Sequence, residues 1–199
     1  LSDQYRDELL NNVLPFWLQN SQDKEFGGYF TCLDREGKVF DTDKFIWLQG
    51  REVWMFSMLY NKVEKRQEWL DCAVQGGEFL KKYGHDGNYN WYFSLDRSGR
   101  PLVEPYNIFS YTFATMAFGQ LSLATGNQEY AYIARKTFDI ILSKVDNPKG
   151  KWNKLHPDTR NLKNFALPMI LCNLAMEIEH ILGKDYLERA MNTCIHEVM

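Results

Sequence analysis

The stretch Lys44-Phe45-Ile46-Trp47-Leu48-Gln49-Gly50-Arg51-Glu52-Val53-Trp54-Met55 is the most informative part of this sequence for its fold. Its apolar residues recur at three- and four-residue spacings, which predicts a helix from Asp43 to about Val63. Arg51 stands inside this aromatic, apolar segment, where a buried arginine requires an anionic or oxygen-rich partner. Trp47 and Arg51 are four residues apart and therefore share one face of the helix. We expect that face to line a cavity.

The same periodicity recurs along the chain in about seven segments of similar length, so the sequence predicts an all-α protein. Ser2 is expected to cap the first segment, and Pro15 is expected to kink it. Gly84, Gly126 and Gly183 stand where helix C-caps are expected. The predicted helices span residues 2 to about 17, 43–63, 67–83, 107–125, 128–145, 164–182 and 185–199.

An internal repeat groups these helices in pairs. Trp69, Tyr130 and Tyr186 each follow an acidic residue at the start of a helix, and an alanine stands four residues after each of them. The aromatics are 61 and 56 residues apart, which suits two full-length helices and a loop. Coincidence among helix-start residues is the alternative. The repeat predicts a helical hairpin as the structural unit.

Three connections between these helices are long. Aromatic residues at 26–30 precede a polar turn at 34–37, and those at 90–95 precede a turn at 96–101, which predicts short β-hairpin loops over one end of the helices. The connection at 146–163 is polar and contains Pro148, Gly150 and Pro157, so it is predicted to be a loop.

Composition narrows the class of protein. A chain of 199 residues that is 45% apolar can bury a core, and a net charge of -3 from interspersed charges excludes a basic surface for nucleic acid. No apolar run approaches ~18 residues and no signal peptide is evident, so no membrane partner is expected. The four cysteines form no CxxC pair. Cys72, Cys172 and Cys194 are predicted to be reduced core thiols of a cytoplasmic protein.

No metal site or phosphate loop is expected. The four histidines lack the spacing of metal ligands, and the Gly-Gly pairs lack the context of a phosphate-binding loop. His85, His156, His180 and His196 are therefore predicted to be surface or capping residues.

Three hairpins and one extra helix do not close a ring of helical pairs. The last helix also lacks the polar outer face that a terminal repeat requires. Its apolar stripe consists of Ala190, Met191, Cys194, Ile195 and Val198. We therefore expect residues 1–199 to be the N-terminal half of a single larger helical domain, with an apolar edge left exposed.

The stretch at 44–55 resembles the signature of the N-acylglucosamine 2-epimerases. Further stretches agree in the same order, at 25–31, 76–80, 97–101, 108–110, 115–117 and 167–169. The resemblance covers the whole chain but only the first half of the family's usual length. It implies an (α/α)6 toroid of helical hairpins, about half of which is present here, with a central pocket for an aldose.

The resemblance also implies the reaction, in which the C2 proton of the sugar is removed and returned so that C2 is inverted. The family's two catalytic histidines lie in the second half and have no counterparts in this sequence. Related cellobiose epimerases and aldose-ketose isomerases carry a further histidine where this chain has Met169-Ile170-Leu171. That difference favours an amino-sugar substrate, with interconversion of N-acetylglucosamine and N-acetylmannosamine.

Partners and cofactors are expected on the same basis. The resemblance implies that no cofactor is required. Nucleotides modulate some members of the family, so ATP is a candidate modulator at a site that the sequence does not identify, and a homodimer is a candidate assembly.

The family places Arg51 in the sugar pocket. There its planar fork would hold O1 or O2 and stabilise the negative charge of an enediolate-like transition state. A structural ion pair with Glu52 or another acid is the alternative. Trp54 is expected to fill core. The candidate substrate-binding residues are Trp47, Gln49, Phe109, Tyr111 and Met169, and core packing is the alternative for the first four.

Two other functions remain open at this point. An unsaturated glucuronyl hydrolase on the same toroid would need paired carboxylates, for which Glu52, Glu78 and Asp139 are available, although solvated or ion-paired roles are expected for them. A non-catalytic interaction protein is the second, because fold alone does not determine function. The segment from Trp47 to Arg51 favours the epimerase.

Overall fold

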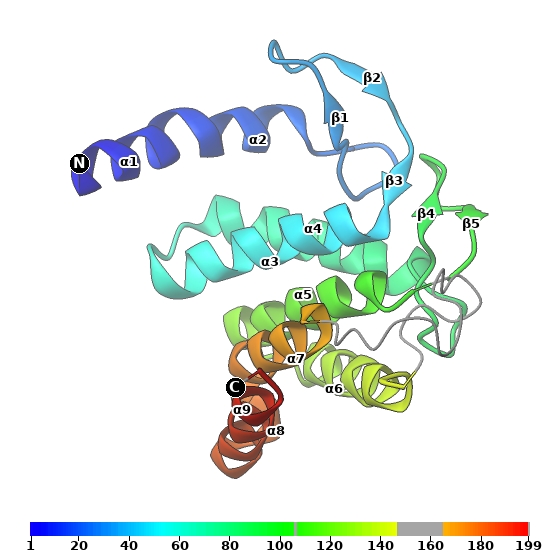
Figure 1. Cartoon of the computed structure of the whole chain (residues 1–199). Helices are drawn as coiled ribbons and strands as arrows, with labels where there is room; N and C mark the ends of the chain where they lie inside the picture. Colours follow the sequence, from blue (N-terminus) through cyan, green and yellow to red (C-terminus); the bar gives the residue numbers. More distant parts are fainter. Residues whose placement is uncertain (106, 147–164, 199) are drawn as a thin grey trace.

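The computed structural model describes residues 1–105, 107–146 and 165–198, and these residues are mainly helical (Figure 1). The strands in these residues are two or three residues long and lie mainly in hairpins, close to what the sequence predicts. The helices are α1 (Ser2–Glu8), α2 (Leu14–Asn20), α3 (Ile46–Lys62), α4 (Gln67–Tyr83), α5 (Phe109–Thr125), α6 (Gln128–Ser143), α7 (Ala166–Glu177), α8 (Glu179–Leu182) and α9 (Lys184–Val198). The strands are β1 (Cys32–Leu33), β2 (Val39–Asp41), β3 (Lys44–Phe45), β4 (Ser94–Leu95) and β5 (Pro101–Val103).

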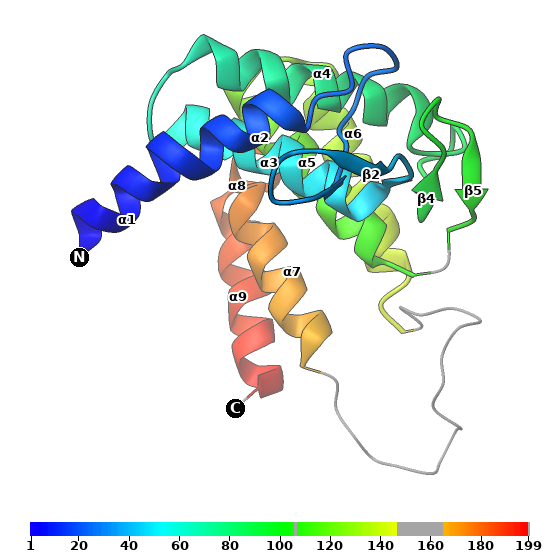
Figure 2. The same cartoon turned by 90° about the horizontal axis from the view of Figure 1, so that it is seen from above.

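The helices form two layers. Helix α5 packs against α3 on one side and α7 on the other, and these three form the inner layer. Helices α4, α6 and α9 each pack against the inner helix that precedes them, so the hairpins α3–α4, α5–α6 and α7–α9 follow one another in an arc (Figures 1 and 2). The predicted hairpin unit is therefore confirmed.

Two glycines allow the inner helices to approach closely. A Cβ atom on Gly50 of α3 would lie 2.9 Å from the backbone carbonyl of Phe113 in α5. A Cβ atom on Gly119 of α5 would lie 2.4 Å from Cγ2 of Ile178, just after α7. Because backbone atoms cannot move aside cheaply, a larger residue at Gly50 would force α3 and α5 apart.

The internal repeat has a structural counterpart. Trp69, Tyr130 and Tyr186 are each the third residue of an outer helix, in α4, α6 and α9 respectively. Trp69 and Tyr130 are buried and Tyr186 is half-buried. The equivalent positions confirm that the repeat reflects three similar hairpins.

Several predicted helix boundaries are wrong. The central helix begins at Ile46 rather than Asp43, because Lys44–Phe45 forms strand β3. The helix predicted over 164–182 is divided into α7 and α8, with a break at Ile178. Ser2 lies inside α1 and makes no capping hydrogen bond. The spacing of apolar residues locates a helix but does not fix the residues at which it begins, breaks or ends.

Other local predictions agree with the structure. Gly84, Gly126 and Gly183 are the C-cap residues of α4, α5 and α8. Just before Pro15, residues Leu9–Val13 form a π-helical turn, since proline has no N–H for the regular helical ladder.

The strands lie at one end of the helices, around the start of α3 (Figure 1). Strand β1 pairs antiparallel with β2, and β4 pairs antiparallel with both β3 and β5. Both predicted hairpins are present, and the pairing of β3 with β4 was not expected. The predicted loop at 146–163 lies almost entirely outside the described residues. Within the described part of the chain, no helix has the length and apolar character needed to cross a bilayer.

The hairpin α7–α9 carries an apolar groove of about 590 Å³. Met169 and Ile195 on its walls are 66% and 54% exposed. Cys172 and Cys194 are half-buried in this groove, and only Cys72 is a fully buried thiol, which corrects the prediction for the other two. The walls of the groove are formed by Phe165, Pro168, Met169, Cys172, Asn173, Met176, Cys194 and Ile195.

Candidate active site

Arg51 is exposed on the second turn of α3, where two aromatic rings flank its guanidinium. Its Cζ atom lies 5.8 Å from the ring centroid of Trp47 and 5.2 Å from that of Phe113 on α5. Trp47 and Arg51 therefore share a helix face, as their spacing predicts. Among the described residues no carboxylate forms an ion pair with Arg51. Cation–π contacts hold the charge in place and leave its N–H donors open to a ligand.

A pocket of about 350 Å³ opens beside Arg51, between α3, α2 and the loop that leads to β1. This volume is at the lower end of the range for small-molecule sites. Arg51 and Glu52 are the two ionisable residues among the described groups that line it, and the hydroxyl of Thr31 is buried there without a hydrogen-bond partner. The pocket is lined by Trp17, Thr31, Leu48, Arg51, Glu52, Trp54 and Met55.

Gln49 has a different position from the one expected of a sugar contact. Its side chain is 0% exposed and makes two hydrogen bonds to the backbone of Tyr29: Oε1 accepts from the Tyr29 N–H and Nε2 donates to the Tyr29 carbonyl, both at 2.8 Å. Gly28, at φ +69°, passes so close to Gln49 that a Cβ atom would lie 2.7 Å from Oε1. Gln49 thus holds the loop before β1, which corrects its assignment as a substrate-binding residue.

The remaining candidates are dispersed. Tyr111 is 2% exposed and its hydroxyl donates to Asn90, so it belongs to the core, which corrects its assignment as a sugar contact. Phe109 is exposed at the first residue of α5. Met169 faces the groove of α7–α9 rather than the pocket of Arg51. The structure brings together Arg51, Trp47 and the unforeseen Phe113.

The candidate carboxylates do not form a catalytic pair. Glu78 pairs with Lys81 at 3.0 Å on α4, and Asp139 pairs with Arg135 at 3.1 Å on α6, so both are ion-paired on outer helices as expected. Glu52 is neither solvated nor ion-paired, contrary to expectation. It is 7% exposed and hydrogen-bonds to Ser21 Oγ. Burial raises the pKa of Glu52 to about 8.

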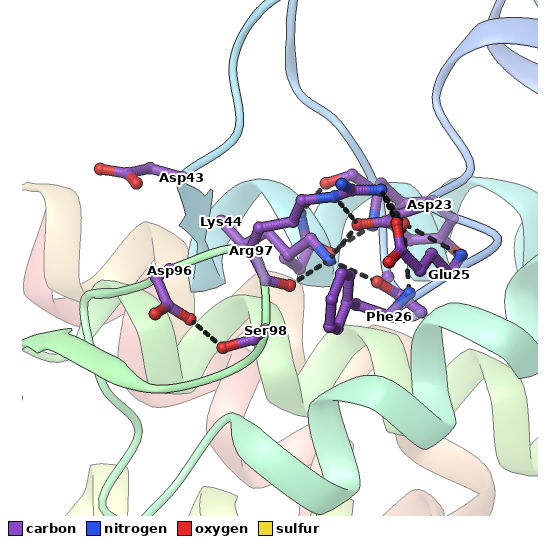
Figure 3. Close-up of polar contacts among 12 residues, drawn as sticks. Asp23, Glu25, Phe26, Asp43, Lys44, Asp96, Arg97 and Ser98 are labelled. Atoms are coloured by element: carbon purple, nitrogen blue, oxygen red, sulfur yellow. Dashed lines mark hydrogen bonds and ion pairs between the residues drawn. The ribbon is translucent and has the colours of Figure 1, made fainter.

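A partly buried ionic cluster fixes the loops beside the pocket (Figure 3). We call Asp23, Lys44 and Arg97 the loop clamp. Lys44 Nζ and Arg97 Nε lie 3.0 and 2.9 Å from Asp23 Oδ2, and the side chains of Asp23 and Lys44 are 0% exposed. Burial opposes ionisation of Asp23, but the hydrogen bonds from Arg97 and Lys44 outweigh it and lower the pKa of Asp23 to about 2.

The clamp joins three segments that are distant in sequence. Asp23 lies in the loop after α2, Lys44 forms β3, and Arg97 lies in the turn between β4 and β5. No spacing rule connects positions separated by 21 and 74 residues, and the sequence therefore contained no signal for this cluster. Its structural effect is to hold both hairpin loops over the start of α3.

A second unforeseen network crosses the inner helices. Glu177 Oε2, at the end of α7, accepts hydrogen bonds from Trp54 Nε1 of α3 at 3.0 Å and from Gln120 Nε2 of α5 at 2.8 Å. Asn61 in turn donates to Gln120. Trp54 was expected to fill core. It is instead half-buried and lines the pocket.

The histidines within the described residues lie away from the pocket. His85 packs its ring against Trp91, His180 hydrogen-bonds to Ser122, and His196 is exposed near the end of α9. His156 lies outside the described residues. In the described ranges no group of three or more histidine, cysteine, aspartate or glutamate residues is arranged to hold a metal ion.

The family described as N-acylglucosamine 2-epimerase (GlcNAc 2-epimerase) matches residues 28–199, which is most of the chain. The chain belongs to this family. It is 41% identical over 174 residues to the N-acylglucosamine 2-epimerase of Bos taurus, covering 85% of this chain and 41% of that protein. With the enzyme of the same name from Mus musculus it shares 37% identity over 201 residues, covering 97% of this chain and 48% of that protein.

A solved structure of a sugar epimerase from a ruminal bacterium has the same fold. Its TM-score is 0.80 at 22% identity, and the match covers 96% of this chain and 53% of that one. This epimerase-family chain therefore has the arrangement of hairpins of an α/α toroid. It spans less than half the length of the two mammalian relatives.

Proposed function

We propose that this chain contributes the Arg51 side of the sugar pocket in a 2-epimerase that interconverts N-acetylglucosamine and N-acetylmannosamine. One observation carries the proposal: the guanidinium of Arg51 has no carboxylate partner among the described residues, and two aromatic rings hold it at the edge of a pocket. The names of the mammalian relatives support the choice of an amino sugar.

The chemistry needs such a group. Removing the C2 proton of an aldose moves negative charge onto O1, and returning a proton to the opposite face inverts C2. A fixed guanidinium that donates to O1 or O2 stabilises this charge more in the transition state than in the substrate. Trp47 and Phe113 keep the guanidinium oriented, so it requires little reorganisation during the reaction.

We further propose that the proton-transferring acid and base come from residues outside this chain, as the family resemblance implies. The supporting fact is that the relatives are more than twice as long as the segment they share with this chain. A cytoplasmic location is also proposed, and its support is that all four cysteines are free.

Substitution of Arg51 in the full-length enzyme tests the proposal. Arg51→Lys keeps the charge but loses the planar pair of donors, so deuterium exchange at C2 of N-acetylmannosamine should fall by about 10²-fold or more, with folding little changed. Arg135→Lys, on the outer helix α6, is the matched control and should retain the wild-type rate. Wild-type exchange in a folded Arg51→Lys enzyme would show that Arg51 is structural.

A further inference from the structure

Glu52 occupies an unusual site for a carboxyl group. It lies on α3 with 7% of its surface exposed, and Ser21, immediately after α2, is its hydrogen-bond partner. No described lysine or arginine lies within ion-pair distance of it. A buried carboxylate without a cation is strongly disfavoured, whereas a neutral carboxylic acid needs only one hydrogen-bond acceptor.

Counting protons at Ser21 identifies that acceptor. The hydroxyl of Ser21 has one proton, and its Oγ lies 2.6 Å from the carbonyl oxygen of Trp17, which can only accept. The Ser21 proton is therefore used by Trp17. Ser21 Oγ is also within donor distance of Glu52 Oε1, and one hydroxyl proton cannot serve both contacts, so the second proton has to come from a neutral Glu52 that donates to Ser21 Oγ.

The other groups around Glu52 keep the site neutral. Tyr29 in the loop before β1 and Cys72 of α4 are the titratable groups that face it from other elements, and burial together with the proximity of Glu52 raises the pKa of both. Arg51, the neighbour of Glu52 on α3, is the remaining ionisable group on the described walls of the pocket. Neither Tyr29 nor Cys72 can supply the positive charge that an ionised Glu52 would need.

We propose that Glu52 is a neutral carboxylic acid in the folded protein and acts as a positioning residue, joining α3 to α2 while leaving Arg51 as the one charged group of the pocket. This inference rests on the proposed function for its catalytic consequence. Glu52 lines the same pocket, so its ionisation would add a negative charge there and oppose the negative charge that develops on the sugar oxygens. Ionisation of Glu52 should therefore impair the site.

The protonation state can be measured without any activity. Carboxyl carbons of ¹³C-labelled glutamates change their NMR shift on ionisation, and the Glu52 resonance can be assigned through bonds in the unmodified chain. We expect it to titrate near pH 8 and to be missing from Glu52→Gln, while Glu188→Gln, an exposed control on α9, retains it. Titration of Glu52 near the usual glutamate pKa would overturn the proposal.

The catalytic consequence is tested by the pH profile of the full-length enzyme. The neutral fraction of an acid of pKa about 8 falls about eightfold between pH 7.5 and pH 9, and C2 deuterium exchange by the wild type should fall with it. In Glu52→Gln, the exchange rate at pH 9 should be close to the rate at pH 7.5, whatever the absolute rate of the variant. An equal decline in both proteins would refute the positioning role. Absence of exchange in the wild type would instead refute the proposed function, and the NMR titration would still test Glu52.

Discussion

Arg51 and Glu52 are consecutive residues of α3, and the fold gives them opposite electrostatic environments. The guanidinium of Arg51 is exposed between two aromatic rings, whereas the carboxyl of Glu52 is buried against α2. Consecutive positions on a helix point in different directions, so a single polar dipeptide can present its cation to a ligand and its acid to the core. The ion pair between them, which was the alternative to a substrate-binding role for Arg51, does not form.

A stability prediction follows for Glu52. The unfolded chain loses its proton near the ordinary value of 4.5, but the folded protein keeps it until about pH 8, so the unfolded state binds fewer protons between these values. The free energy of unfolding should therefore decrease as pH rises through this window, by up to ~1.4 kcal/mol per pH unit. Urea unfolding of Glu52→Gln at pH 5, 6.5 and 8 should lack this contribution. Parallel profiles for the variant and the wild type would contradict the prediction.

At the scale of elements, short strands and loops position the start of α3. Strand β3 leads directly into α3 and pairs with β4, while Gln49 holds the backbone of Tyr29 and the loop clamp joins the two hairpin loops. Each of these contacts is buried or half-buried, where hydrogen bonds and ion pairs are less weakened by water. The loops beside the pocket are thereby fixed to the helical layer.

Asp23→Asn should destabilise this arrangement by ~3–5 kcal/mol, because it leaves Lys44 buried without a counter-charge. Urea unfolding measures the loss. Glu25→Gln is the matched control, since it removes an exposed partner of the same Arg97 and should cost ~1 kcal/mol or less. Equal effects of the two variants would show that the buried pair has no special role.

The clamp also predicts acid sensitivity. The pKa of Asp23 is lowered from 3.8 to about 2, so its stabilising contribution is complete above pH 3.8 and is lost as pH falls towards 2. In Asp23→Asn this part of the acid transition should be absent. Circular dichroism between pH 5 and pH 2 measures the acid unfolding of the wild type and of Asp23→Asn. The same transition in both proteins would show that Asp23 is not the group responsible.

At the scale of the whole molecule, Glu177 connects the three inner helices. Its carboxylate accepts from Trp54 of α3 and Gln120 of α5, and Gly50 and Gly119 allow the close packing that these hydrogen bonds require. The three inner helices therefore behave as one layer, against which the outer helices pack.

Removing this carboxylate should loosen that layer. We expect Glu177→Ala to lower the free energy of unfolding by ~2 kcal/mol, since the half-buried Trp54 and the buried Gln120 both lose a charged acceptor. Amide hydrogen exchange should increase in α3, α5 and α7 more than in α4. Glu177→Gln keeps one acceptor oxygen and should have a smaller effect. Uniform exchange increases across all helices would argue against a local role.

Much of this architecture was determined by the sequence alone. Helix order, the hairpin unit, the glycine caps and both β-hairpin loops follow from spacings of a few residues, because helices and turns form through local interactions. The contact of Trp47 with Arg51 also follows from local spacing, since residues four apart on a helix share a face. The motif around Arg51 also indicated the family.

Only the tertiary structure decided which polar residues face the pocket. Gln49 and Tyr111 lie near the start of their helices, where ligand-binding residues were expected. Both are nevertheless buried by segments that are distant along the chain. The neutral state of Glu52, 31 residues from Ser21, and the contact of Trp54 with Glu177, 123 residues away, arise in the same way. Burial, protonation and hydrogen bonding depend on the neighbours that folding brings together, and local spacing contains no information about those neighbours.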